Sequence, residues 1–223
     1  MGFIAQYRHT IIAIALCGLA WWFLSPQSPR VFLPEYLEDG VNCSYIGSNA
    51  GDNGPSETAV PASMQPLVLS KLKMTPVKGY TVSARVLQRT RYLYDDLAKI
   101  STFDWIIGWD FMGNKKALTR LKYTLKNRSF AIERGKGGLL DYSPNDLVHH
   151  FTTVHLIPAN KSIASKINKI GVGDNVRLEG WLVNLETPNW TQDTGTMEIE
   201  GSEILLVCRV VPLSPQKVWP NFK

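Results

Sequence analysis

Residues 176–182 have the sequence VRLEGWL, in which the even-numbered positions are apolar or small and Arg177 and Glu179 occupy the first odd-numbered ones. This two-residue repeat is typical of a β-strand with one buried face. A glycine-containing turn, residues 171–174 (GVGD), precedes the stretch. Residues 80–86, YTVSARV, alternate in the same way. Both stretches predict half-buried strands, and we expect an antiparallel sheet.

The other regular patterns predict one more strand and three short helices. Residues 204–211 are almost continuously apolar, as expected of a strand that is buried on both faces. Apolar residues recur at helical spacing after Ser162 and after Asn114, and residues 143–146 (SPND) combine an N-cap, a first-turn proline and a dipole-matching acid. The predicted class is α+β. We expect a small, mainly antiparallel barrel-like or sandwich domain with short helices, of the size of oligonucleotide/oligosaccharide-binding domains.

The N-terminal segment has the composition of a membrane helix. Residues 11–24 contain no charged or strongly polar side chain. The run is shorter than the roughly 20 residues that cross a bilayer, so the helix needs the preceding residues, with Arg8 reaching the head groups. Trp21 and Trp22 would then lie at the far interface, as in an aromatic belt. We expect a transmembrane helix that contacts the membrane through residues 3–24.

A cleaved signal peptide is the alternative interpretation, with residues 18–20 (GLA) as the cleavage site. Cleavage there would leave the apolar residues 21–24 at the new N-terminus, which favours an uncleaved signal anchor. Arg8 precedes the apolar run, and by the positive-inside rule this places the following domain outside the cytoplasm. The sequence therefore predicts a single-pass protein with an extracytoplasmic domain.

The chain of 223 residues is long enough for one ordinary domain with appendages. Residues 47–66 are rich in glycine, serine and proline and lack apolar periodicity, which predicts a flexible linker. The predicted organisation is a signal anchor over 1–30, a linker over 31–66, a soluble α+β domain over 67–213 and a C-terminal tail over 214–223.

The net charge of +5 does not by itself indicate a nucleic-acid partner. The basic side chains are interleaved with apolar residues along the chain, whereas a nucleic-acid footprint is a concentrated stripe or a known module. We therefore do not expect nucleic-acid binding.

Two of the three cysteines, Cys43 and Cys208, lie outside the apolar N-terminal run that contains Cys17. In an oxidising compartment these two can form a disulfide, which would close a long loop and stabilise the fold by about 4 to 5 kcal/mol in the entropic model. Two buried free thiols are the alternative. Both readings stay open at the level of the sequence.

Several blocks between residues 92 and 195 occur in a distinctive order. They are Tyr92 and Tyr94-Asp95, residues 104–109 (DWIIGW), Met112, residues 155–160 (HLIPAN), residues 173–182 (GDNVRLEGWL) and residues 193–195 (DTG). In this order the chain, over roughly Pro66 to Val211, resembles a widespread family of uncharacterised bacterial membrane-anchored proteins. The resemblance implies a bacterial inner-membrane origin and carries no activity, cofactor or partner. One departure is Asp110, because a glycine is expected after Trp109, and this departure bears on the local turn.

His155 is the candidate general base of the sequence. It lies in an extended apolar run, so we expect it to be partly buried, with Asp104 or Asp95 as the carboxylate that orients the imidazole. The alternative is a structural histidine that is bonded to a backbone carbonyl, and this is the commoner role.

Three tryptophans are candidates for a ligand platform. Trp105 and Trp109 are spaced so that a helix would stack them on one face, and Trp181 completes an aromatic centre. Packing in the core of a small domain is the alternative role of all three.

The other chemical motifs are weak. Residues 193–195 (DTG) spell the aspartic-protease triplet, but no apolar strand precedes them and no second copy exists, so we expect a turn. Adjacent His149 and His150 would point about 100° apart on a helix and do not readily chelate one ion. We predict no metal site and no cofactor.

These observations favour a membrane-tethered, extracytoplasmic binding or accessory module of the bacterial cell envelope with a protein partner. The tether and linker set its reach and effective concentration at the membrane. An envelope hydrolase that uses His155 with Asp104 or Asp95 is the alternative. Whether the protein is an enzyme stays open.

Overall fold

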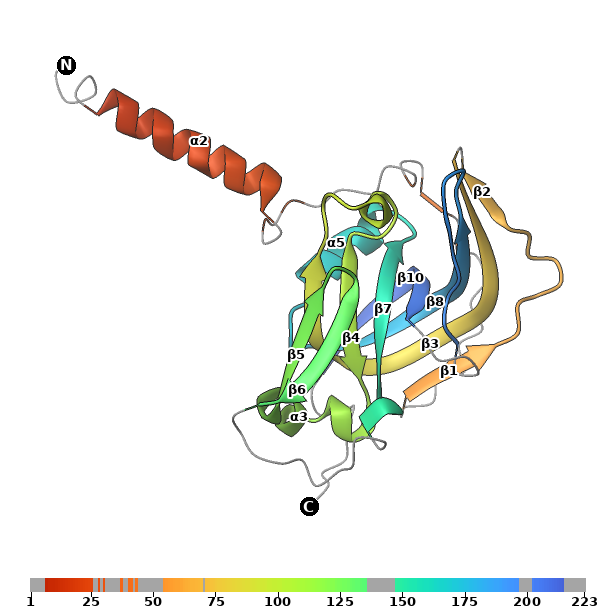
Figure 1. Ribbon diagram of the computed structural model, residues 1–223. Coiled ribbons are helices and arrows are strands. Elements are labelled where there is room, and N and C mark those ends of the chain that lie inside the picture. The colour runs from red at the N-terminus through yellow and green to blue at the C-terminus, as the bar shows by residue number, and fades with distance from the viewer. Residues whose placement is uncertain are drawn as a thin grey trace.

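The computed structural model describes residues 7–25, 28, 30, 37, 40–41, 43, 54–69, 71–135, 147–196 and 202–214. Strands dominate, and the described helices are few (Figure 1). The described helices are α2 (Arg8–Leu24), α3 (Lys115–Arg120) and α5 (Lys161–Lys169), with 3-10 turns at Asp96–Lys99 and Asp110–Gly113. The described strands are β1 (Gly54–Thr58), β2 (Leu67–Leu69), β3 (Leu72–Arg91), β4 (Phe103–Gly108), β5 (Leu121–Lys126), β6 (Ser129–Arg134), β7 (Phe151–Pro158), β8 (Asn175–Glu186), β9 (Thr191–Gln192) and β10 (Glu203–Leu213).

A closed ring of strands forms the body of the protein. Strands β3, β4, β7, β10 and β8 pair in this order, and β8 pairs again with β3. All of these pairs are antiparallel except β7 with β10, in which Ile204 pairs with His155. The predicted strands 80–86, 176–182 and 204–211 lie in β3, β8 and β10. Because the ring is closed, the domain is a barrel and not a sandwich. Its size and its five described strands resemble those of an oligonucleotide/oligosaccharide-binding barrel.

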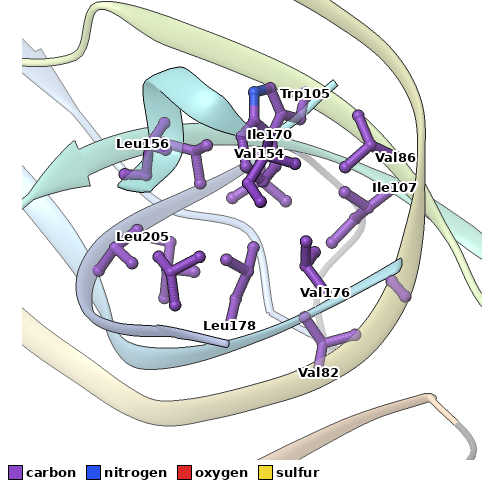
Figure 2. Packing of buried hydrophobic residues seen from close by; sticks show 14 of the residues in the cluster. Val82, Val86, Trp105, Ile107, Val154, Leu156, Ile170, Val176, Leu178 and Leu205 are labelled. Carbon is purple, nitrogen blue, oxygen red and sulfur yellow. The ribbon is translucent and has the colours of Figure 1, made fainter. Parts of the chain in front are cut away.

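The barrel is filled by the apolar face of each strand and is plugged at one end by α5. Trp105 and Ile107 of β4 point inward, whereas Ile106 belongs to a different cluster outside. Figure 2 shows the inward-facing valines and leucines from β3, β7, β8 and β10 packed together, with Trp105 beside Ile170 at the helix end. The apolar face of α5 joins the same core, as its helical spacing predicts, and Asn160 caps the helix by accepting a hydrogen bond from the backbone N–H of Ile163.

Segments from outside the ring cover two parts of its outer surface. The hairpin formed by β5 and β6 packs Tyr123 and Leu125 against Ile106 of β4. Elsewhere, Leu37 lies against the outward side chains of β8 and β10, including Trp181 and Leu206. Both surfaces are thereby removed from solvent.

A disulfide joins Cys43 to Cys208, with the two Cα atoms 5.5 Å apart and a sequence separation of 165. Cys43 precedes the barrel and Cys208 lies in β10, so the bond fastens the N-terminal segment to the outside of the ring. In the entropic model a loop of this length contributes about 4 to 5 kcal/mol.

The predicted linker over 31–66 is wrong in its second half. Strand β1 (Gly54–Thr58) pairs with residues 79–83 of β3 and continues the edge that β4 leaves free. The sequence GPSET has no alternating pattern because its residues are half-buried at an edge, so periodicity did not reveal the strand. Neighbouring residues 44–53 lie outside the described residues, as do most of the predicted helix from Pro144 and all but the first residue of the predicted tail.

Helix α2 carries its apolar side chains all around its axis, and none of them is buried by the barrel. Figure 1 shows it extending away from the domain. Within the part of the chain that the structure describes, no helix is both long and apolar enough to cross a membrane. The predicted transmembrane helix is therefore not supported, since the described helix has 17 residues and a rise of about 1.5 Å per residue leaves it short of the roughly 30 Å hydrocarbon core.

Asp110 adopts the left-handed backbone conformation, with φ of 50°, at the position where the sequence analysis expects a glycine. It begins the 3-10 turn Asp110–Gly113, and its Oδ2 lies 3.5 Å from Nε2 of His150. Aspartate tolerates this region better than most residues, whereas glycine enters it without a steric cost.

We expect Asp110→Gly to unfold at a higher temperature than Asp110→Ala. Both variants lose the contact to His150, but only alanine retains the steric cost of a positive φ, which is about 1 kcal/mol. Thermal unfolding of the full-length protein measures the difference. Equal midpoints would show that the turn relaxes out of this conformation.

Candidate functional site

His155 and Asp104, the candidate base and its orienting carboxylate, are neighbours on adjacent strands. They are paired residues in the register of β4 and β7, and both point away from the barrel interior that Trp105 and Val154 fill. Nδ1 of His155 lies 2.7 Å from Oδ1 of Asp104, and the side chains are 2% and 0% exposed. The contact is a close approach and not an aligned hydrogen bond, because Nδ1 has no acceptor in hydrogen-bond geometry among the described residues.

Arg128 joins this pair to the third predicted residue, Asp95. Its Nη1 lies 2.6 Å from Oδ1 of Asp104, and its Nη2 lies 2.8 Å from Oδ1 of Asp95 and donates to the carbonyl of Ser101 at 2.9 Å. The guanidinium also lies over the ring of Tyr92, 3.9 Å from its centroid. A planar guanidinium can bind two carboxylates and a carbonyl at once, because its N–H donors point in fixed and different directions.

The backbone at the tip of the β5–β6 hairpin delivers Arg128 to this position. Asn127 and Arg128 have φ values of 52° and 62°, as in the two-residue turns that match the twist of a hairpin. Sequence analysis missed Arg128, because Asn-Arg is a much weaker turn signal than Asn-Gly. The available signal was an asparagine between the alternating stretches 121–126 and 129–134.

The structure thus brings together all three predicted catalytic residues, but it does so beneath the hairpin. Asp95 also caps the following 3-10 turn, since it accepts a hydrogen bond from the N–H of Ala98 at 2.7 Å. No hydrogen bond joins His155 to a described hydroxyl or thiol. A buried charge is costly unless it is paired, and Arg128 compensates Asp104 in the place where the hairpin meets the barrel. The arrangement fixes the hairpin and leaves no described nucleophile in contact with the histidine.

The three predicted ligand-binding tryptophans are core residues. Trp105, Trp109 and Trp181 are 0%, 8% and 2% exposed. Trp105 lies on strand β4 and not on a helix, so the expected stacking with Trp109 on one helical face is wrong. Trp181 belongs to a separate cluster outside the barrel. Large aromatic rings fill the space that a small barrel must close, and none of the three offers a broad exposed face to a ligand.

Glu203 is a buried acid that sequence analysis did not single out. It opens β10 and accepts a hydrogen bond from the hydroxyl of Thr152. The pKa of Glu203 is raised from its ordinary value of 4.5 to about 7, chiefly by burial; the charge of Glu57 contributes to the shift, and hydrogen bonds from Thr152 and from the Glu203 backbone oppose it. Burial and the nearby Glu203 also raise the pKa of Tyr80, whose hydroxyl has no hydrogen-bond partner among the described residues. The apolar run 204–211 gave no reason to expect a buried acid directly before it.

No set of three or more histidine, cysteine, aspartate or glutamate side chains among the described residues is arranged to hold a metal ion. Comparisons of the chain with protein-family models, with curated proteins and with solved structures found no match.

We expect Arg128→Ala to lower the free energy of unfolding by roughly 3 kcal/mol, because it leaves the buried Asp104 carboxylate without its guanidinium partner. The double variant Arg128→Ala with Asp104→Asn should recover part of this loss, since no uncompensated charge remains. Lys73→Ala is the control: its ammonium lies 2.8 Å from Glu186 and both side chains are exposed, at 44% and 57%, so the cost should stay below about 1 kcal/mol. Denaturant unfolding of the three variants decides, and a loss at Arg128 no larger than at Lys73 would contradict the network.

Glu203 should make the protein less stable as the pH rises. Its carboxyl is protonated in the folded and unfolded chains below pH 4.5, ionises first in the unfolded chain as the pH rises, and is ionised in both only above about 7. Relative to Glu203→Gln, the wild type should therefore lose up to about 3 kcal/mol of stability across this window. Glu186→Gln, which alters an exposed partner of Lys73, serves as the control. Parallel pH profiles of the wild type and Glu203→Gln would contradict the raised pKa.

Proposed function

We propose that this chain is a membrane-attached, extracytoplasmic binding module of the bacterial cell envelope and that its partner is another protein. The observation that carries the proposal is the β5–β6 hairpin, which is locked to the barrel at its tip through Arg128 and leaves β6 exposed. A strand held rigidly at the surface is a ready site for a partner peptide.

The surface of β6 supports a protein partner. Ser129, Phe130 and Ala131 are exposed, and Phe130 is 47% exposed although it is a large apolar residue. Within the described residues β6 pairs only with β5, so its other edge carries backbone groups that can bind an extended peptide. Phe130 supplies an apolar anchor on this edge, where it also meets the ring of Phe151 edge-on.

The same hairpin argues against a nucleic-acid ligand. Barrels of the oligonucleotide/oligosaccharide-binding type use the face of their second and third strands, which correspond here to β4 and β7. Ile106 of β4 and Phe151 of β7 are instead packed under the hairpin side chains. The scattered basic residues of the sequence point in the same direction.

Attachment to the membrane is supported by α2 and by the N-terminal sequence. A helix that is apolar on every side is stable only in a core or in lipid, and the barrel covers none of α2. Uncharged residues also precede Arg8 in the sequence. The Cys43–Cys208 disulfide supports an oxidising and hence extracytoplasmic location, because such bonds are rare in the cytosol. The resemblance to bacterial membrane-anchored proteins supports the envelope as its place.

The hydrolase alternative has less support. A general base must reach its substrate within about 3 Å, whereas His155 and Asp104 lie buried under the hairpin that Arg128 holds in place. A structural role, in which Asp104 binds Arg128 and so stabilises the hairpin, accounts for their geometry.

Site-specific photo-cross-linking in intact cells tests the protein partner. A benzophenone side chain at Phe130 should yield a discrete adduct with one envelope protein, and the same group at Val172, which is 51% exposed in a turn, should not. Phe130→Glu should weaken recovery of that protein from membranes roughly 10-fold, the loss expected for an interface anchor of more than about 1 kcal/mol. If Phe130 and Val172 give the same adducts, or none, in folded protein at the membrane, the proposal is wrong.

A further inference from the structure

The C-terminal end of α2 is joined to the barrel by hydrogen bonds. The last carbonyl groups of a helix have no partner within the helix and must find one elsewhere. In α2 the carbonyl of Trp22 accepts a hydrogen bond from the hydroxyl of Ser28 at 2.7 Å. The hydroxyl of Tyr94, in the loop between β3 and β4, lies 3.4 Å from the carbonyl of Leu24 and donates to it. One of the two partners therefore comes from the barrel itself.

Arg91, the last residue of β3, holds the chain that follows α2. Its side chain is buried, and its Nη1 donates to the carbonyl of Ser28 at 2.7 Å while its Nη2 donates to the carbonyl of Arg30 at 2.9 Å. Ser28 is buried as well, and the guanidinium of Arg30 lies over the ring of Phe23, 4.7 Å from its centroid. Hydrogen bonds from a charged donor are among the stronger ones, and burial strengthens them further. The ends of α2 and β3 therefore form one unit.

Tyr94 is an exposed aromatic residue at this junction. It is 75% exposed although its ring is large and apolar. Tyrosine and tryptophan are enriched at the boundary between lipid and water, where the ring meets apolar groups and the polar tip meets water. Trp21 and Trp22, in the last turn of α2, are also exposed. With α2 in lipid, Leu24 ends the apolar helix at this boundary, and its contact with Tyr94 places the tyrosine at the same depth.

The charged residues around Tyr94 are paired. Asp95 lies 2.8 Å from Nη2 of Arg128, whose backbone N–H also donates to the hydroxyl of Tyr92 at 3.2 Å. Asp96 lies 3.2 Å from the ammonium of Lys99. Each of these two acids therefore has a basic partner, which reduces its repulsion from lipid phosphates. The tip of the β5–β6 hairpin belongs to the same end of the barrel as Tyr94.

We infer that residues 92–95 rest on the lipid head groups of the membrane, with the ring of Tyr94 in the interface, and that Arg91 holds the barrel in this one orientation. This inference rests on the proposed membrane attachment. A flexible tether would leave the carbonyls of Trp22 and Leu24 to water and would let any face of the barrel approach the lipid. The junction instead presents one end of the barrel to the membrane.

Val148 marks the opposite end of the barrel. Strand β4 begins at Phe103, after the loop that contains Tyr94, and its last residue, Gly108, pairs with Phe151 of β7. Val148 precedes Phe151 by three residues and is 55% exposed. The six residues of β4 separate the two ends by about 17 Å. A label at Val148 should therefore stay away from the lipid.

The test compares two fluorescent labels in the full-length protein, reconstituted in phosphatidylcholine vesicles in which some lipids carry a nitroxide on the head group. Cys17→Ala removes the free thiol, and Asp96→Cys or Val148→Cys provides a single new one. Labelling without reductant preserves the Cys43–Cys208 disulfide. We expect the nitroxide lipids to quench the label at position 96 and to leave the label at position 148 largely unquenched. Equal quenching at the two positions would overturn the inference.

Variants of the junction identify the contacts that set the orientation. Tyr94→Ser removes the ring from the interface and should reduce the quenching at position 96, whereas Tyr94→Phe keeps the ring and should retain most of it. Val172→Ser removes an exposed apolar side chain from a turn and is the control, which should change neither label. Unchanged quenching in Tyr94→Ser, or an equal change in Val172→Ser, would overturn the inference.

Arg91→Gln tests the clamp. In a variant whose circular dichroism shows the native fold, the label at position 148 should become quenched, because the barrel can then turn on its tether. A folded Arg91→Gln variant with the original difference between the two labels would refute the clamp. If the variant does not fold, the Tyr94 variants still decide the inference.

Alkaline extraction of cell membranes separates this inference from the proposed function. A protein that stays in the membrane while its two labels are equally quenched refutes the orientation alone. A protein that is released refutes the membrane attachment and the inference with it.

Discussion

The pairing of β3 with strands on both of its sides is the constraint from which the rest of the structure follows. Its N-terminal part pairs with β8 and its C-terminal part with β4, so one strand closes the ring. Closure requires bending, and the register of β3 shifts at Pro76–Lys78 and again at Val86–Gln88. Proline has no N–H for a sheet ladder and is tolerated at such irregularities. On the partner strand, a Cβ at Gly180 would collide with the backbone carbonyl of Leu206, so this crossing requires glycine.

A ring that is closed and apolar on both faces of several strands creates a second problem, because its outward apolar side chains need a cover. The protein covers them with chain that lies outside the ring. The β5–β6 hairpin covers Ile106 and its neighbours, and Leu37, Val41 and Cys43 lie in the cluster that contains Trp181 and Leu206. One interaction attaches each of these segments to the barrel: the ion pair of Arg128 with Asp104 for the hairpin, and the Cys43–Cys208 disulfide for the N-terminal segment. In both interactions the two partners are distant in sequence.

This arrangement explains why a group of residues that suggests catalysis is better understood as structural. An imidazole beside a buried carboxylate is a common catalytic pair, and His155 and Asp104 have the distance for it. The carboxylate is also the anchor of Arg128, and the pair is buried by the element that Arg128 holds. Within the described residues, the surface that we propose for interaction with a protein partner is the edge of β6 that pairs with no described strand.

The sequence alone determined the elements whose burial is periodic. Strands at 80–86 and 176–182 and helices after Asn114 and Ser162 follow from apolar side chains that repeat every two or every 3.6 residues, because each such element buries one face. The strand at 204–211 follows from its nearly continuous apolar run. It also placed His155 in an extended apolar run, which is β7 in the structure. It did not reveal β1, which lies half-buried at an edge, or the strand conformation of Trp105, whose four-residue spacing from Trp109 mimics a helix. Only the tertiary structure brought Arg128 to Asp104 and Asp95 and made Glu203 a buried acid, because these contacts join segments that are separated in sequence and depend on how the ring closes.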